Sequence, residues 1–271
     1  MATAQPFAPA PDSLATPVRT ITSDDLRQVL REGWSDFMTM RGDLIFVGLL
    51  YPLVGIVAAT VTLGGALLPL FFPIAAGIAL LGPVVAIGFY ELARRREQGL
   101  ASRWTHFLDV RRRPSADGIG AVAALLLTLF ALWIVVAAAL YVGLWGSNVP
   151  TSVPAFLSRL FTTPEGWALI LAGNAIGPGF AVAVLAISVV SLPMLVDCDV
   201  EARAAVRTSI AAFRANKGAM LRWGFIIAAL LVLGSIPFFV GLAVVLPWLG
   251  YATWHLYTRL VDRSALPGCG T

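Results

Sequence analysis

The chain has 271 residues, of which 13% are charged and 58% are hydrophobic, and its mean hydropathy is +0.83. Soluble domains carry about a quarter charged residues, so this composition excludes an ordinary soluble protein and indicates a membrane protein. The net charge of +4 does not predict a nucleic-acid partner, because the basic residues lie beside apolar segments and form no basic domain. Anionic lipid headgroups are the expected partners of these residues.

The N-terminal residues 1–21 are rich in Ala, Pro and Thr, and they lack the apolar core of a signal peptide. They predict a disordered cytoplasmic tail. Thr22, three residues before Asp25, resembles a capping box that starts an amphipathic helix. The apolar residues of this helix are Leu26, Val29, Leu30, Trp34 and Phe37. Two interpretations are equally open: the helix lies on the inner membrane surface, or it packs on the ends of neighbouring spans.

Apolar segments long enough to cross a hydrocarbon core of about 30 Å recur along the chain. The predicted spans are residues 44–64, 66–90, 119–145, 167–196, 222–236 and 238–258. The last two divide one apolar stretch at Gly234–Pro237, and the fifth span is short. The sequence therefore predicts an all-α membrane domain over 22–262 with six transmembrane helices, followed by a short cytoplasmic tail, 263–271.

The connecting segments differ in character. Residues 97–110 and 197–221 have apolar residues at helical spacing among arginines, which predicts two further interfacial helices. Each pair of spans thus forms a hairpin that is preceded by an amphipathic helix. Residues 147–165 contain three prolines and are predicted to be the longest external loop.

The distribution of basic residues predicts the orientation. Of the nineteen basic residues, only Arg159 falls in a loop assigned to the outside. The positive-inside rule then places both termini in the cytoplasm, which requires an even number of spans in a bacterial inner membrane. Cys198 and Cys269 both fall in segments assigned to the cytoplasm, where thiols stay reduced, so we expect them to be free and unpaired.

A proline recurs in the returning helix of each predicted hairpin, at Pro83, Pro193 and Pro247, and polar helix follows each time. This order predicts an internal threefold repeat in which three kinked hairpins pack around one axis. The alternative is that any hairpin protein with frequent prolines gives the same impression.

One polar group interrupts the fourth span. Asn174 lies between Gly173 and Gly177, directly before Pro178. A broken-helix binding site of the kind that transporters use is one interpretation. A helix-packing motif with one satisfied amide is favoured, because no charged residue lies in the middle of another span.

Charged and metal-ligating residues gather at the ends of spans. Glu91 with Arg94 and Arg95 has the spacing of an interfacial ion pair, which anchors a helix at the headgroups. The acidic residues after the fourth span would spread over different helix faces, so no metal site is predicted. His106 and His255 could together hold a haem, but aromatic-belt positions suit them better. The sequence contains no catalytic motif and predicts neither an enzyme nor a cofactor.

Three blocks are distinctive in combination: LLGPVVAIGFYELARRREQG, SVVSLPMLVDCDVEARAAVRTS and VLPWLGYATWHLYTRLV. With the opening LREGWSDF, they resemble the domain-of-unknown-function 2189 family of bacterial predicted integral membrane proteins, over residues 25–262. The resemblance implies a six-span inner-membrane protein with no established activity, and it supplies no site residues.

Together these observations predict a non-enzymatic membrane protein that acts as an accessory or assembly subunit or interacts with lipids, with other membrane proteins as further candidate partners. The alternative is a small-solute transporter or channel that uses the kinked helices around Asn174. A haem-binding membrane protein is the third hypothesis.

Overall fold

The computed structural model describes residues 18–48, 68–147, 150, 152–237, 239–266 and 268–269, and everything below concerns these residues. They form ten α-helices and three 3-10 helices, which confirms the predicted all-α class. The α-helices are α1 (Ser23–Gly48), α3 (Phe71–Leu80), α4 (Gly82–Glu97), α5 (Ala116–Trp145), α6 (Val153–Thr162), α7 (Pro164–Ser188), α8 (Ser191–Asp197), α9 (Ala202–Ala215), α10 (Lys217–Ser235) and α11 (Leu242–Leu260). The 3-10 helices are η1 (Leu68–Leu70), η2 (Trp104–Arg112) and η3 (Arg263–Ala265).

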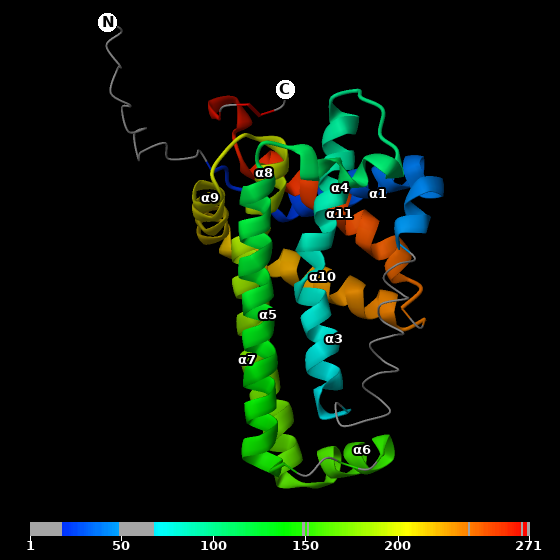
Figure 1. Ribbon diagram of the computed structural model, residues 1–271, viewed down its shortest axis with the longest axis vertical. Helices are drawn as coiled ribbons and strands as arrows, with labels where there is room; N and C mark the ends of the chain where they lie inside the picture. The colour runs from blue at the N-terminus through cyan, green and yellow to red at the C-terminus, as the bar shows by residue number, and fades with distance from the viewer. Residues whose placement is uncertain are drawn as a thin grey trace, which may run out of the picture.

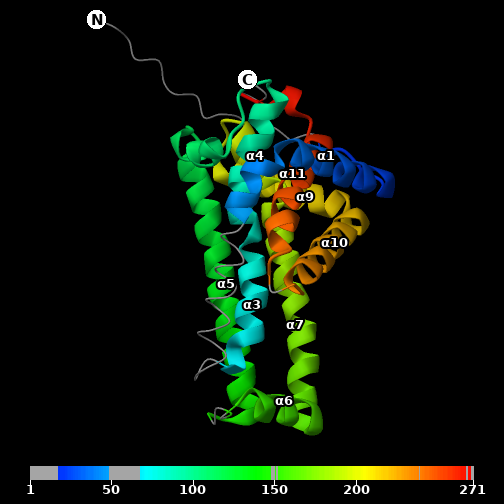
Figure 2. The same cartoon turned by 90° about the vertical axis from the view of Figure 1, so that its right-hand side faces the viewer.

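The molecule has two parts, which we call the stem and the head (Figure 1). The stem consists of α3, α5 and α7, which run along the long axis, and of α6, which crosses their far end (Figure 2). The head consists of α1, α4, η2, α8, α9, the C-terminal part of α11 and the segment after it. The helices α10 and α11 form a hairpin, and its turn lies part-way along the length of the stem in both views (Figures 1 and 2).

Three helical segments are long and apolar enough to cross a membrane: Ala116–Trp145, Pro164–Asp197 and Lys217–Ser235. They overlap the predicted third, fourth and fifth spans. The predicted first span begins in the last residues of α1, and its remainder, from residue 49 on, lies outside the described residues. The predicted second span is divided into η1, α3 and α4. The count of six spans and the threefold repeat stay predictions.

The divided helices break just before two of the recurring prolines. A turn at Leu81 separates α3 from α4 ahead of Pro83, and residues 189–190 separate α7 from α8 ahead of Pro193. Proline removes a backbone donor and clashes with the carbonyl four residues earlier, which explains these breaks. The N–H of Val190 donates instead to the buried hydroxyl of Ser209 on α9, at 3.2 Å. In contrast, Pro247 lies inside the continuous helix α11.

Helix α1 packs along α11, which favours the second interpretation of the N-terminal helix. Its residues Leu26, Val29 and Phe37 are buried in the head, and the indole of Trp248 donates to the carbonyl of Leu30 at 2.8 Å. A Cβ at Gly33 would lie 2.5 Å from the backbone of α11, so the two helices are in close contact there. Most of the apolar stripe of α1 therefore faces protein, while Trp34 stays 39% exposed.

Thr22 and Asp25 form the predicted capping box, which begins α1. Two other expectations need correction. Residues 153–162 form α6 within the predicted external loop, because Phe156 and Leu160 pack on aromatic residues of α5. The second interfacial segment is the 3-10 helix η2 and not an α-helix, and the third is the α-helix α9 alone.

Candidate functional site

The first polar cluster of the head surrounds Glu91, which is 1% exposed. Arg94, one turn later on α4, donates two hydrogen bonds to its carboxylate, at 2.8 and 3.1 Å. Arg95 and Arg113 approach the same carboxylate to 3.9 and 3.6 Å. The structure thus contains the ion pairs that the helical spacing suggested, but they are buried among helices of the head. An isolated buried charge is costly, so each member of this cluster depends on the others.

A second cluster joins α1 to α11. Arg259 binds both carboxylate oxygens of Glu32, at 2.7 and 2.8 Å. His255 lies 2.9 Å from Asp36, which also pairs with Arg96 of α4 at 3.1 Å. A bidentate arginine–carboxylate pair fixes the relative orientation of its two partners, so α1 has one defined position on α11.

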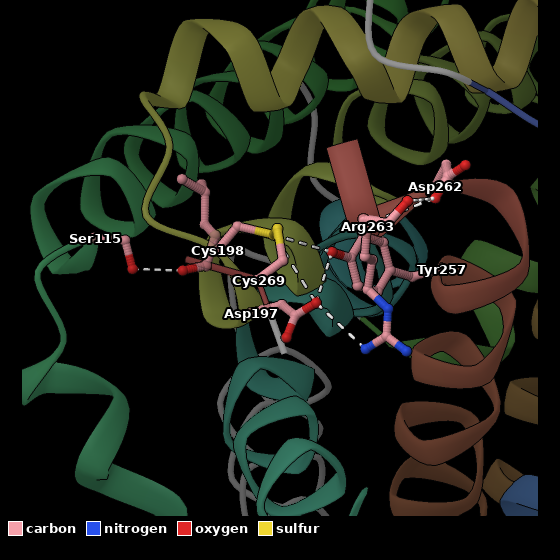
Figure 3. Close-up of a disulfide and its surroundings, with 9 residues drawn as sticks. Ser115, Asp197, Cys198, Tyr257, Asp262, Arg263 and Cys269 are labelled. Atoms are coloured by element: carbon pink, nitrogen blue, oxygen red, sulfur yellow. Dashed lines mark hydrogen bonds and ion pairs between the residues drawn. A yellow bond between two sulfur atoms is a disulfide. The ribbon is translucent and has the colours of Figure 1, made fainter. Parts of the chain in front are cut away.

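A third cluster lies where α8 ends, below the returning C-terminal segment (Figure 3). Asp197 is completely buried and accepts a hydrogen bond from the hydroxyl of Tyr257 at 3.0 Å. Arg263 approaches Asp197 to 3.5 Å and also binds Glu97, which accepts the indole N–H of Trp254 at 2.9 Å. These contacts link α8, α11, η3 and the end of α4.

Two carboxyl groups of the second and third clusters, Glu32 and Glu97, have pKa values below their ordinary range. The bond from Arg259 lowers the pKa of Glu32, and this effect exceeds that of burial. Burial alone would raise the pKa of Glu97, but the hydrogen bond and charge of Arg263 and the N–H of Trp254 lower it overall. Both groups are therefore ionised and paired at neutral pH.

The outer surface of the head has two further features. Helix α9 presents Arg203, Arg207 and Arg214 to the outside, and Lys217 begins the next helix, α10. All four side chains are exposed. The spacing of four and seven residues keeps the three arginines on one face of the helix, and we call this face, together with Lys217, the basic face of α9. The opposite face, which includes Ala205, Ser209 and Ala212, is buried against the bundle.

The second feature is an apolar edge on η2 and the residues before it. Leu100, Trp104 and Leu108 are 48–54% exposed, although they are large and apolar. Arg111 and Arg112 follow them with exposed side chains. Such a combination of apolar and basic side chains suits the interfacial layer of a membrane.

The predicted site in the fourth span lies apart from these clusters. Asn174 is exposed on α7, and its amide donates to the carbonyl of Ile170 in its own helix at 2.8 Å. A Cβ at Gly173 would meet no atom within 4 Å, so no helix packs closely there. The side chain of Asn174 thus faces away from the helices of the stem.

Gly177 and Pro178 differ from each other in their surroundings. A Cβ at Gly177 would lie 3.3 Å from the indole of Trp133 on α5, so this glycine does allow close packing. The same indole donates to the carbonyl of Pro73 at 2.8 Å and ties α5 to α3. Pro178 is exposed within the continuous helix α7.

Cys198 and Cys269 form a disulfide, so the expectation of two free cysteines is wrong. The expectation rested on the compartment and on their separation of 71 residues. The fold returns the C-terminal segment across the end of α8, which brings the two Cα atoms within 4.2 Å. The separation of the two cysteines along the sequence therefore did not indicate that they lie close together in the fold.

The two histidines have separate partners. His106 accepts the backbone N–H of Arg103 through Nδ1 at 3.0 Å, within the turn that begins η2. His255 belongs to the cluster between α1 and α11. Neither residue is among the described groups whose ligand atoms converge closely enough to hold a metal ion.

These features define a class of protein. Long apolar helices expose leucine, valine and phenylalanine along the stem and on α10, while charged side chains concentrate at one end. Only lipid makes such an exposed surface stable, so this is a multi-pass helical integral membrane protein.

The comparison with known families agrees with this class. Residues 71–197 match the family described as "predicted integral membrane protein (DUF2189)", which confirms the resemblance over this region. The matched region extends from α3 to the end of α8, and it contains both Glu91 and Asp197. This match covers the central part of the chain, and the family is one of unknown function. No curated protein and no solved structure matches the chain.

Proposed function

We propose that the protein is a non-enzymatic accessory or assembly subunit of a bacterial inner membrane, which crosses the bilayer six times and binds anionic lipid through its head. The basic face of α9 is the observation that carries this proposal. Its four cations are exposed, and no acidic residue occurs between Glu201 and Asp262. Basic residues near an anionic membrane surface contribute about 1 kcal/mol each to binding.

The position of α9 supports this role. The helix lies beside the upper part of α5 and packs against α5, α7 and α8, where the stem meets the head (Figure 1). If the stem crosses the bilayer, the basic face lies at the level of the headgroups. The apolar edge at Leu100, Trp104 and Leu108 belongs to the same end of the molecule and would insert beside it.

The ends of the described chain support an even number of spans. Val18 pairs with Val261 in an isolated β-bridge, and Arg19 binds Asp262 at 3.1 Å. Both ends therefore lie in the head. Because the head holds nearly all the basic residues, and Arg159 lies at the far end on α6, the positive-inside rule favours a cytoplasmic head.

The contacts of Asn174 favour this proposal over a transporter. A transport site requires polar groups that converge on a cavity inside the bundle. Asn174 instead bonds to its own helix and points outward. A hollow on α5 is lined by Val136, Ala139, Leu140, Gly143 and Leu144, all of which are apolar.

The experiment compares lipid-dependent thermal stability. The full-length protein in mild detergent is mixed with phosphatidylglycerol or with phosphatidylcholine, and its melting temperature is measured. We expect phosphatidylglycerol to stabilise the wild type, and high salt to reduce the effect. Arg203→Gln/Arg207→Gln/Arg214→Gln should weaken binding by about 3 kcal/mol, roughly a hundredfold, and abolish most of the stabilisation.

The control is Arg27→Gln/Arg31→Gln, which removes two positive charges from other exposed positions, both on α1. We expect this control to respond to phosphatidylglycerol like the wild type. Equal melting temperatures of all three proteins in phosphatidylcholine would show that they fold alike. An α9 variant that keeps the full response to phosphatidylglycerol would refute the proposal.

A further inference from the structure

Three potential metal ligands meet where α8 ends and the C-terminal segment returns (Figure 3). The carboxylate of Asp197 and the sulfur atoms of Cys198 and Cys269 all lie within 4.8 Å of one another. The oxygen Oδ2 of Asp197 is 3.9 Å from the sulfur of Cys198. Neighbouring ligands of a tetrahedral zinc ion, with bonds of about 2.0–2.3 Å, are separated by roughly 3.3–3.8 Å. The three groups therefore fit one coordination sphere once the sulfur atoms separate.

The redox state decides whether the sulfur atoms are available. In a cytoplasmic head, cellular thiols reduce exposed or accessible disulfides. The exchange consumes two thiols: Cys198–S–S–Cys269 and two RSH give two cysteine thiols and RSSR. Because Cys269 is only partly buried, its sulfur offers a path for attack. The reduced protein then holds two thiols and a carboxylate at one point of the fold.

We propose that the reduced protein binds one zinc ion through Cys198, Cys269 and Asp197. Binding releases the two thiol protons and gives a bis-thiolate with one carboxylate ligand. Zinc accepts this combination of sulfur and oxygen donors, and a water molecule completes the tetrahedron on the partly exposed side of Cys269.

The surroundings complement such an ion. Zinc with three anionic ligands carries a net charge of −1, and the guanidinium of Arg263, 3.5 Å from Asp197, compensates this charge. The hydroxyl of Tyr257 contacts both Asp197, at 3.0 Å, and Cys198, at 3.4 Å. It is placed as an outer partner that orients the ligands. The ion would hold the C-terminal segment on α8 in the reduced protein, as the disulfide does in the oxidised one.

The test uses the full-length protein in detergent, reduced with a phosphine under anaerobic conditions. Cobalt(II) replaces zinc as a visible probe. We expect one equivalent to bind, with the intense absorption of thiolate-to-cobalt charge transfer, and zinc to displace it. Cys269→Ser and Asp197→Asn should each bind at least about a hundredfold more weakly, because even the loss of an outer partner costs ten- to a hundredfold.

Asp199→Asn is the control, since it removes a nearby exposed carboxylate that lies outside the ligand group. We expect it to bind cobalt like the wild type. Because Asp197 is buried and its variant could unfold, the Cys269→Ser variant at the chain end decides the test. Cobalt binding by Cys269→Ser at wild-type affinity would refute the site. A complete Cys198–Cys269 disulfide in protein whose thiols are alkylated during cell lysis would also refute it.

Discussion

The head and the stem are stabilised by different interactions. In the head, directional bonds between charged groups join segments distant in sequence, as Glu32 and Arg259 do. In the stem, apolar surfaces pack with few polar contacts, and only 22% of the apolar window of α5 is buried within the protein. The apolar surface of the stem is therefore covered by lipid, whereas the head is stabilised by contacts within the protein. Substitutions should therefore have much larger effects in the head than in the stem.

The strongest test of this difference removes the charge of Glu91. Glu91→Gln leaves Arg94, Arg95 and Arg113 without their shared carboxylate, so we expect the free energy of unfolding to fall by about 3–5 kcal/mol. Unfolding in detergent, followed by circular dichroism, measures the change. Glu165→Gln alters an exposed carboxylate at the start of α7 and should change stability by less than about 0.5 kcal/mol. Similar effects of the two substitutions would contradict the comparison.

A second test uses one glycine from each region. Gly33→Ala places a methyl group against the backbone of α11 and should cost about 1–3 kcal/mol, because α1 must move away. Gly173→Ala meets open space on α7, and its higher helix propensity should stabilise the protein by up to about 1 kcal/mol. Both values come from the same unfolding measurement. If Gly33→Ala proved the milder change, the close contact of α1 with α11 would be wrong.

Acidification should act on the head before the stem. The pKa values of Glu32 and Glu97 are lower in the folded protein than the 4.5 of a free glutamate. Their pairing thus contributes stability above about pH 4.5, and this contribution is lost as the pH falls through the folded values. Hydrogen exchange at decreasing pH should show α1 losing protection before α5. Simultaneous loss in both helices would argue against the difference.

The smallest effect is expected at Asn174. Asn174→Leu replaces an outward-facing amide whose hydrogen bond stays within its own helix, so stability should change by less than about 0.5 kcal/mol. Solute flux through proteoliposomes with the wild type and the variant is the accompanying measurement. A solute flux that the substitution abolishes would support the transporter alternative instead.

The sequence predicted what depends on local spacing or on hydropathy. The long apolar helices, the capping box at Thr22 and the pairing of Glu91 with Arg94 are of this kind. Helix α6 was missed because its two buried residues, Phe156 and Leu160, pack on aromatic residues of α5, and neither its short length nor its proline indicates this contact.

The remaining contacts depend on how distant segments meet. His255 and Asp36 are 219 residues apart, and nothing in their local sequence links them. The same holds for Tyr257 with Asp197 and for the two cysteines. A usable signal was present in the charged residues themselves, because Glu97, Asp197 and Arg259 all lie where an apolar helix becomes polar. Such residues are expected to find partners near the same membrane surface.

The contact of α1 with α11 has a consequence for biosynthesis. Among the α-helices that the structure describes, the first to emerge from the ribosome packs on the last one, since Leu30 and Trp248 are 218 residues apart. At about 5–20 residues per second, translation leaves the apolar stripe of α1 without its native partner for roughly ten seconds or more. Until then, a chaperone or the bilayer surface must cover that stripe. A chain whose translation stops before α11 never buries the stripe against its native partner.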